Sequence, residues 1–97
     1  MNLDEIPIGE GRTLTIGDEQ VAVFRLRDGT VRALGAVCPH RGGPLADGLI
    51  DNTVVVCPLH GLTYDLISGA ETTTNGEATC AHPVTIHTDG ELSIRPC

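Results

Sequence analysis

A chain of 97 residues suits one compact domain whose core is too small to enclose a large substrate cavity as well. The formal net charge is -7 without a run of like charges, which argues against binding to nucleic acid or to anionic lipid. No apolar stretch approaches the roughly 20 residues that span a bilayer. The first residues lack the basic and apolar pattern of a signal peptide, so the expected location is the cytoplasm.

The elements that the sequence predicts are strands joined by tight turns. The expected strands cover residues 13–16, 21–26, 31–34, 49–50, 54–56, 84–87 and 91–95. Turns are predicted at four pairs of turn-forming residues: Gly17-Asp18, Asp28-Gly29, Asp51-Asn52 and Asp89-Gly90. In the last hairpin, four apolar side chains are predicted to share one buried face: Val84, Ile86, Leu92 and Ile94.

No window shows helical apolar spacing with caps, and twelve Gly and six Pro in so short a chain favour turns. We therefore expect an all-β domain, an antiparallel sandwich or barrel, over residues 1–97. Residues 36–68 differ from the flanking strands because they carry two short loops rich in Cys, His, Gly and Pro. They are expected to form a small ligand-binding subdomain at one end of the fold.

Each of these loops supplies one Cys and one His. The first holds Cys38 and His40, and the second, after sixteen intervening residues, holds Cys57 and His60. Four cysteines suit either two disulfides in a secreted protein or a metal site in a reducing compartment, and the missing secretion signal favours the metal. Two thiolates and two imidazoles suit zinc or an iron-sulfur centre. Zinc sites usually pair Cys with Cys and His with His, so these mixed pairs favour two irons bridged by sulfide.

This double motif resembles the signature of the Rieske proteins, which bind a 2Fe-2S cluster. The resemblance implies that Cys38, His40, Cys57 and His60 are the ligands, and that the chain transfers single electrons without catalysis of its own. In Rieske centres two His replace two Cys on one iron, which raises the potential to about -150 to +300 mV. The fold would be a Rieske-type domain with the cluster-binding subdomain at about residues 36–68.

Residues around the ligands are predicted to tune the cluster. Pro58 restricts the backbone beside Cys57, and backbone N–H groups near three glycines, Gly42, Gly43 and Gly61, are expected to donate to sulfur. In high-potential members a Ser and a Tyr after the second loop also donate to sulfur, and here Leu62 replaces the Ser while Tyr64 matches the Tyr. A low-to-intermediate potential is therefore expected. Three residues are expected to face a redox partner: His40, Arg41 and His60.

The segments around both loops also resemble the small subunit of assimilatory NAD(P)H nitrite reductase, which implies a large sirohaem and flavin subunit as the partner. A second family with the same fold and ligands is the ferredoxin of ring-hydroxylating dioxygenases, which implies a flavin reductase and a terminal oxygenase. A redox-sensing or structural module is the third alternative. The electron donor and acceptor, the exact potential and the oligomeric state stay open.

Four further Cys and His residues lie near the C-terminus. His82 and His87 are expected on the solvated surface. Cys80 is expected to be a small buried apolar residue and Cys97 a terminal thiol, with no disulfide between them in a reducing compartment.

Overall fold

A computed structural model describes residues 1–37, 44–59 and 61–97. The described residues form nine short strands, all paired antiparallel. Their bounds are β1 Gly11–Ile16, β2 Glu19–Arg25, β3 Val31–Gly35, β4 Leu49–Asp51, β5 Val54–Val56, β6 Thr63–Asp65, β7 Ala81–His82, β8 Val84–Ile86 and β9 Leu92–Ile94. The all-β prediction is confirmed.

Helical structure in the described ranges is limited to two single turns of 3-10 helix, η1 Leu3–Glu5 and η2 Leu45–Asp47. Asn2 caps η1, since its side chain accepts from the backbone N–H of Asp4 at 3.0 Å. Across the described part of the chain, no helix has the length and hydrophobicity that crossing a membrane requires.

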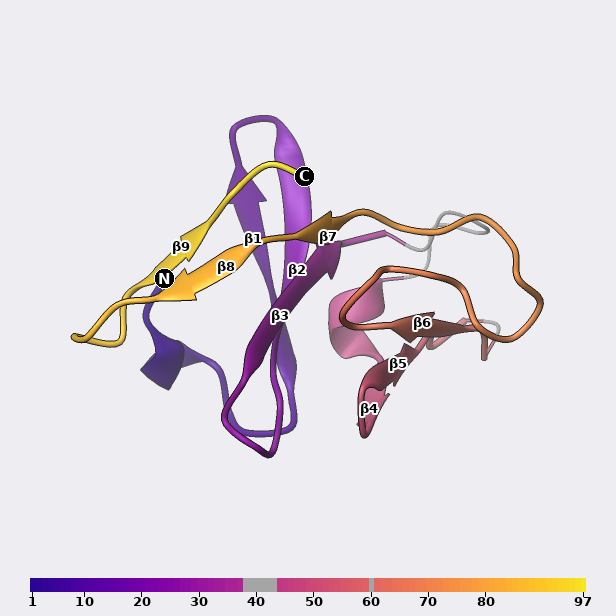
Figure 1. The fold of residues 1–97 in the computed structure, drawn as a ribbon, viewed down its shortest axis with the longest axis horizontal. Helices are drawn as coiled ribbons and strands as arrows, with labels where there is room; N and C mark the ends of the chain where they lie inside the picture. Colours follow the sequence, from indigo (N-terminus) through magenta and orange to yellow (C-terminus); the bar gives the residue numbers. More distant parts are fainter. Residues whose placement is uncertain (38–43, 60) are drawn as a thin grey trace.

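The strands form three sheets, of which the largest has the order β1-β2-β3-β7 (Figure 1). The predicted turns join its first three strands. At the second turn, Asp28 accepts from the backbone N–H of Thr30 at 3.0 Å, and Gly29 adopts a φ of +92°, which favours glycine. The other two sheets are β4-β5-β6 and the hairpin β8-β9.

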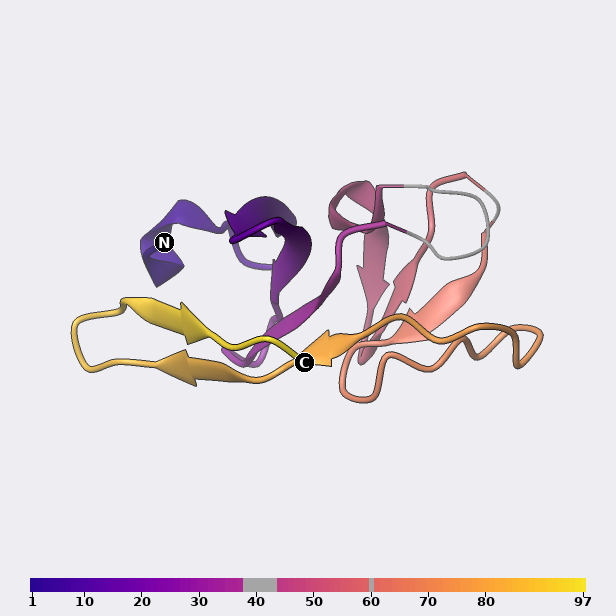
Figure 2. The same cartoon turned by 90° about the horizontal axis from the view of Figure 1, so that it is seen from above.

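Strand β2 is buried on both faces. Its residues 21–24 are all fully buried, and alternation sends Val21 and Val23 to one face and Ala22 and Phe24 to the other. The first face contributes to a hydrophobic cluster with Ile6, Ala33 and Leu92, which packs against the β8-β9 hairpin. The second contributes to a cluster with Leu34, Val55 and Tyr64, which packs against the β4-β5-β6 sheet. The largest sheet therefore separates two cores, and Figure 2 shows the two smaller sheets at opposite ends of the molecule.

The structure adds strands that the sequence did not predict. Strands β6 and β7 are short, and each is held by pairing: β6 with β5, and β7 with β3. The predicted buried face of the last hairpin is only partly correct. Leu92 is buried and Val84 and Ile94 pack against the same cluster, but Ile86 is 43% exposed because the end of the hairpin extends beyond the core.

Candidate functional site

The first predicted ligand loop leaves strand β3 and is closed at its base. Val37 and Pro44 form an isolated antiparallel bridge, and the backbone N–H of Leu45 donates to the carbonyl of Ala36 at 2.9 Å. Helix η2 follows at once and buries Leu45 completely. The predicted site residues between these anchors lie outside the described residues: Cys38, His40, Arg41, Gly42 and Gly43.

The second predicted ligand loop joins β5 to β6. The backbone N–H of Cys57 donates to the carbonyl of Leu62 at 2.7 Å, and the N–H of Gly61 donates back to the carbonyl of Cys57 at 3.0 Å. Gly61 has a φ of +71°, a conformation that a residue with a side chain adopts only under strain. Pro58 is exposed, and His60 lies outside the described residues.

The bases of the two loops meet in one hydrophobic cluster. Ala36 and Leu45 from the first loop and Cys57 from the second are buried members of the same cluster as Tyr64, and Leu62 packs against it. The loops themselves are separated by sixteen residues between His40 and Cys57. Because the bases of both loops pack in the same hydrophobic cluster, the two segments that carry the Cys-His pairs leave the fold close to each other.

Cys57 is the predicted ligand that the structure describes, and its surroundings suit a metal centre. The thiol is free and the residue is 1% exposed. A sulfur buried in the cluster that also contains Tyr64 is shielded from water, and a thiolate is a ligand for iron in iron-sulfur clusters. Tyr64 is also fully buried in this cluster, where the sequence analysis placed a tuning residue.

A turn after β6 supports the second loop from outside. The backbone N–H of Thr72 donates to the carbonyl of Thr63 at 2.8 Å, and Glu71 forms an isolated bridge with Tyr64. Glu71 is buried, with 4% of the residue exposed. It accepts from the hydroxyl of Thr74 and from the backbone N–H groups of Thr73 at 2.5 Å, Thr74 at 2.7 Å and Gly76 at 3.0 Å. The hydrogen bonds from Thr74, followed by those from Gly76 and Thr73, lower the pKa of Glu71 from 4.5 to about 2. Nothing in the sequence pattern marks this carboxylate.

Replacing Glu71 is expected to change how stability depends on pH. A carboxyl group whose pKa is lower in the folded protein stabilises above its unfolded pKa and loses that contribution as the pH falls to its folded pKa. The stability advantage of the wild type over Glu71→Gln should therefore be full at neutral pH and shrink between pH 4.5 and about 2. Urea midpoints measured across this range test it. Glu77→Gln, at an exposed position in the same segment, is the control and should leave the pH dependence unchanged.

The Cys and His residues near the C-terminus differ from the prediction in three respects. Cys80 and Cys97 form a disulfide with a Cα–Cα distance of 6.2 Å, and Cys80 is only partly buried. His82 is 5% exposed, not solvated, because the chain beyond β9 folds back and places the Arg95 carbonyl 2.8 Å from Nδ1 of His82. His87 is exposed as predicted.

An all-β fold in which two loops containing Cys and His are anchored on one hydrophobic cluster is typical of a metal-binding protein. The family model of the Rieske [2Fe-2S] domain matches residues 1–88. The chain belongs to this family, and its cofactor is a Rieske-type 2Fe-2S cluster.

Three known proteins illustrate the similarity. The oxygenase component of dicamba O-demethylase from Stenotrophomonas maltophilia is 39% identical over 85 residues, 88% of this chain. The ferredoxin of carbazole 1,9a-dioxygenase from Nocardioides aromaticivorans IC177 matches with a TM-score of 0.90 and 25% identity over 100% of this chain and 94% of its own. A protein from Mycobacterium tuberculosis described as an NADH-dependent nitrite reductase small subunit matches with the same TM-score and identity over 96% of this chain and 88% of its own.

The two kinds of relative differ in length. This chain spans only 23% of the dicamba O-demethylase component, and smaller shares of the cholesterol 7-desaturase and apoptosis-inducing factor sequences that it matches. It therefore corresponds to one domain of those proteins.

Proposed function

We propose that this chain is an electron carrier that takes one electron from a redox partner and passes it to another. Cys38, His40, Cys57 and His60 would hold the cluster, which supplies one-electron oxidation and reduction. The observation that carries the proposal is the common base of the two ligand loops, where Ala36, Leu45 and Cys57 are buried in one cluster. Residues at about 36–68 act in this proposal as the cluster-binding subdomain, with sheet β4-β5-β6 as its framework.

The chain's own residues near the ligands divide into buried and exposed groups. Cys57 and Tyr64 are buried and exclude water from the base of the site. Val37 and Leu59, each one residue from a proposed ligand, are 51% and 56% exposed. Large exposed apolar side chains beside a redox centre suit brief contact with a partner. We assign the docking surface to this rim, together with His40, Arg41 and His60.

Two kinds of partner system fit the comparisons. A ferredoxin role in an oxygenase system is supported by the carbazole dioxygenase ferredoxin, which is nearly the same length, and by the 39% identity to an oxygenase component. A role as the small subunit of an NAD(P)H nitrite reductase in nitrate assimilation, with a large sirohaem and flavin subunit, is supported by an equal structural match. The higher sequence identity favours the oxygenase system. A cytoplasmic location is part of either proposal.

Electron delivery in reconstituted mixtures tests the partner. Reduced protein is mixed anaerobically with a flavin reductase and a terminal oxygenase from the same organism, or with the large nitrite reductase subunit, and cluster reoxidation is followed by absorbance. Fast reoxidation with the oxygenase supports the first system, and fast reoxidation with the sirohaem subunit supports the second. Slow reoxidation with every partner would contradict the carrier role. Leu59→Ala should slow the productive reaction without changing the cluster spectrum.

The potential is proposed to be low to intermediate within the Rieske span. Leu62 stands where the high-potential proteins carry a Ser that donates to sulfur, and Tyr64 would supply the second hydroxyl. Redox titration of the wild type and Tyr64→Phe measures this, with a lower midpoint expected for the variant. A wild-type midpoint above about +150 mV, in the upper half of the family's span, would contradict the proposal.

A further inference from the structure

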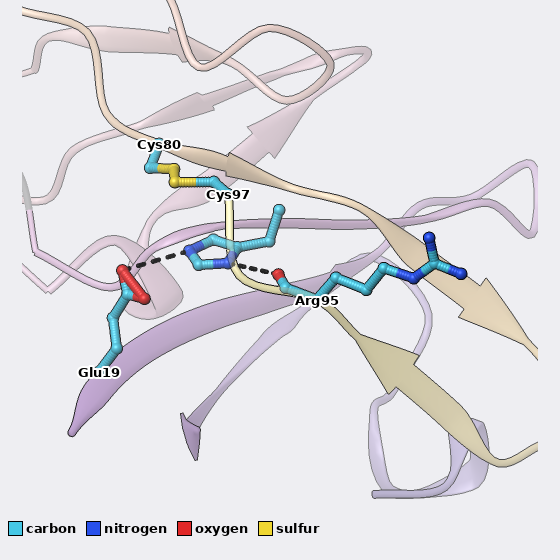
Figure 3. Close-up of a disulfide and its surroundings, with 5 residues drawn as sticks. Glu19, Cys80, Arg95 and Cys97 are labelled. Carbon is cyan, nitrogen blue, oxygen red and sulfur yellow. Dashed lines mark hydrogen bonds and ion pairs between the residues drawn. A yellow bond between two sulfur atoms is a disulfide. The ribbon is translucent and has the colours of Figure 1, made fainter. Parts of the chain in front are cut away.

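A group of side chains gathers at the edge of the largest sheet where β2 and β7 begin and β3 ends. His82 pairs with Ala33 across the β3-β7 ladder, and the N–H of Gly35 donates to the carbonyl of Cys80 at 2.9 Å. The C-terminal segment returns to this edge, since the N–H of Arg95 donates to the carbonyl of Pro83 at 3.0 Å. The return places Cys97 beside Cys80 (Figure 3).

His82 is oriented like a metal ligand. His82 is 5% exposed, and its Nδ1 lies 2.8 Å from the Arg95 carbonyl, which can only accept. Nδ1 therefore donates to this carbonyl, so in the neutral ring the lone pair that can bind a metal is on Nε2. Nε2 is buried and has no hydrogen-bond partner among the described residues. A backbone carbonyl that accepts from one ring nitrogen is the usual arrangement when the other nitrogen binds a metal.

The atoms around this ring suit one tetrahedral ion. The two sulfur atoms of Cys80 and Cys97 and a ring nitrogen of His82 all lie within 4.8 Å of one another. Oε1 of Glu19, at the start of β2, is 3.8 Å from Nε2, on the opposite side of the ring from Arg95 (Figure 3). That distance is too long for a hydrogen bond. It is close to the roughly 3.4 Å that separates a nitrogen and an oxygen bound to the same tetrahedral zinc.

We propose that Cys80, His82 and Cys97, with Glu19 as the fourth ligand, form a second metal site that takes a zinc-class divalent cation when the disulfide is reduced. Two thiolates, one imidazole and one carboxylate are ligands that zinc accepts. The site is distinct from the four proposed cluster ligands, which lie in the loops at 38–40 and 57–60.

The disulfide and the metal exclude each other. Reduction breaks the S–S bond with two electrons and two protons from a dithiol, which itself becomes a disulfide, and leaves two thiols on this chain. Zinc then replaces the two thiol protons, which are released to water. In a reducing compartment the edge of the sheet is held by the ion, and in an oxidising one by the covalent bond.

Zinc binding to the cluster-containing protein tests the site. The disulfide is reduced anaerobically with a phosphine, which takes up the oxygen of water and becomes the oxide, and one equivalent of zinc chloride is added. After gel filtration, zinc and iron are counted per chain, and a chromogenic chelator measures the affinity. We expect one zinc per chain with the iron unchanged, and about two sulfur neighbours at roughly 2.3 Å by X-ray absorption at the zinc edge. Protein whose Cys80–Cys97 disulfide is intact should bind no zinc.

Variants distinguish this site from other binding. Cys97→Ser, at an exposed position, should weaken zinc binding by more than about 100-fold, and Glu19→Gln by about tenfold. Asp18→Asn removes the neighbouring exposed charge and should leave the affinity unchanged. The proposal fails if Cys97→Ser binds zinc as the wild type does, or if zinc enters only as iron leaves. It fails equally if the freed thiols bind no zinc, or if the phosphine leaves the disulfide of the folded protein intact.

Discussion

Cys57→Ser is expected to lose the 2Fe-2S cluster. Position 57 combines a buried thiol with a backbone fixed on both sides, by its own N–H to Leu62 and by the N–H of Gly61 to its carbonyl. The loss of a direct ligand should lower the affinity for the cluster by more than the roughly 10- to 100-fold that loss of a supporting residue costs. Iron and inorganic sulfide per chain, with visible absorption, measure the effect.

Cys97→Ser is the matched control for this experiment, because it removes an exposed sulfur that is not one of the four proposed cluster ligands. It should retain the iron, the sulfide and the visible spectrum of the wild type. If Cys57→Ser keeps a full complement of iron and sulfide, Cys57 is not a ligand, and the assignment of the second loop is wrong.

Phe24→Ala is expected to destabilise the protein by about 3–5 kcal/mol, the usual effect of deleting a buried aromatic ring. Phe24 is fully buried in the cluster that also contains Cys57 and Tyr64. The space is tight, since a Cβ added to Gly11, its partner on β1, would lie 2.8 Å from the ring. Because the backbone of β1 packs so closely against the ring, the strands would have to shift to fill the cavity that Phe24→Ala leaves.

Urea unfolding of the cluster-containing protein under anaerobic conditions measures this effect. Gln20→Ala, at an exposed position of the same strand, should change the free energy of unfolding by less than about 0.5 kcal/mol. A loss below about 1 kcal/mol for Phe24→Ala would mean that β2 does not join the two cores as described. Because the loop bases share the cluster with Phe24, the variant should also lose its iron faster on dilution.

The strands that the sequence predicted are those whose signals are local. The Asp28-Gly29 pair marks a turn by itself, and the apolar run at 21–24 marks a strand. That the run is buried on both faces became clear only from the structure, because burial by two different sheets depends on the order of the strands. Strands β6 and β7 were missed for the same reason: three residues in β6 and two in β7 are too few to show a pattern, and pairing with a neighbouring strand defines them.

The family and the cofactor were predicted from the two Cys-His motifs and are confirmed by the match over residues 1–88. The individual ligands stay a prediction, with three of the four outside the described residues. The burial of His82 and the disulfide of Cys80 and Cys97 were not foreseen. Both depend on the C-terminal segment returning to β7, over a separation of 17 residues between the cysteines, and no local pattern encodes that return.

The most direct test of the central claim is elemental and spectroscopic analysis of protein reconstituted anaerobically. Mixed nitrogen and sulfur ligation of a 2Fe-2S cluster predicts two iron and two sulfide per chain and a reduced paramagnetic resonance signal with an average g below the free-electron value. This should hold in Cys97→Ser as well, where the proposed zinc site is absent. Protein that binds no inorganic sulfide, or that carries zinc in place of iron in that variant, would contradict the account.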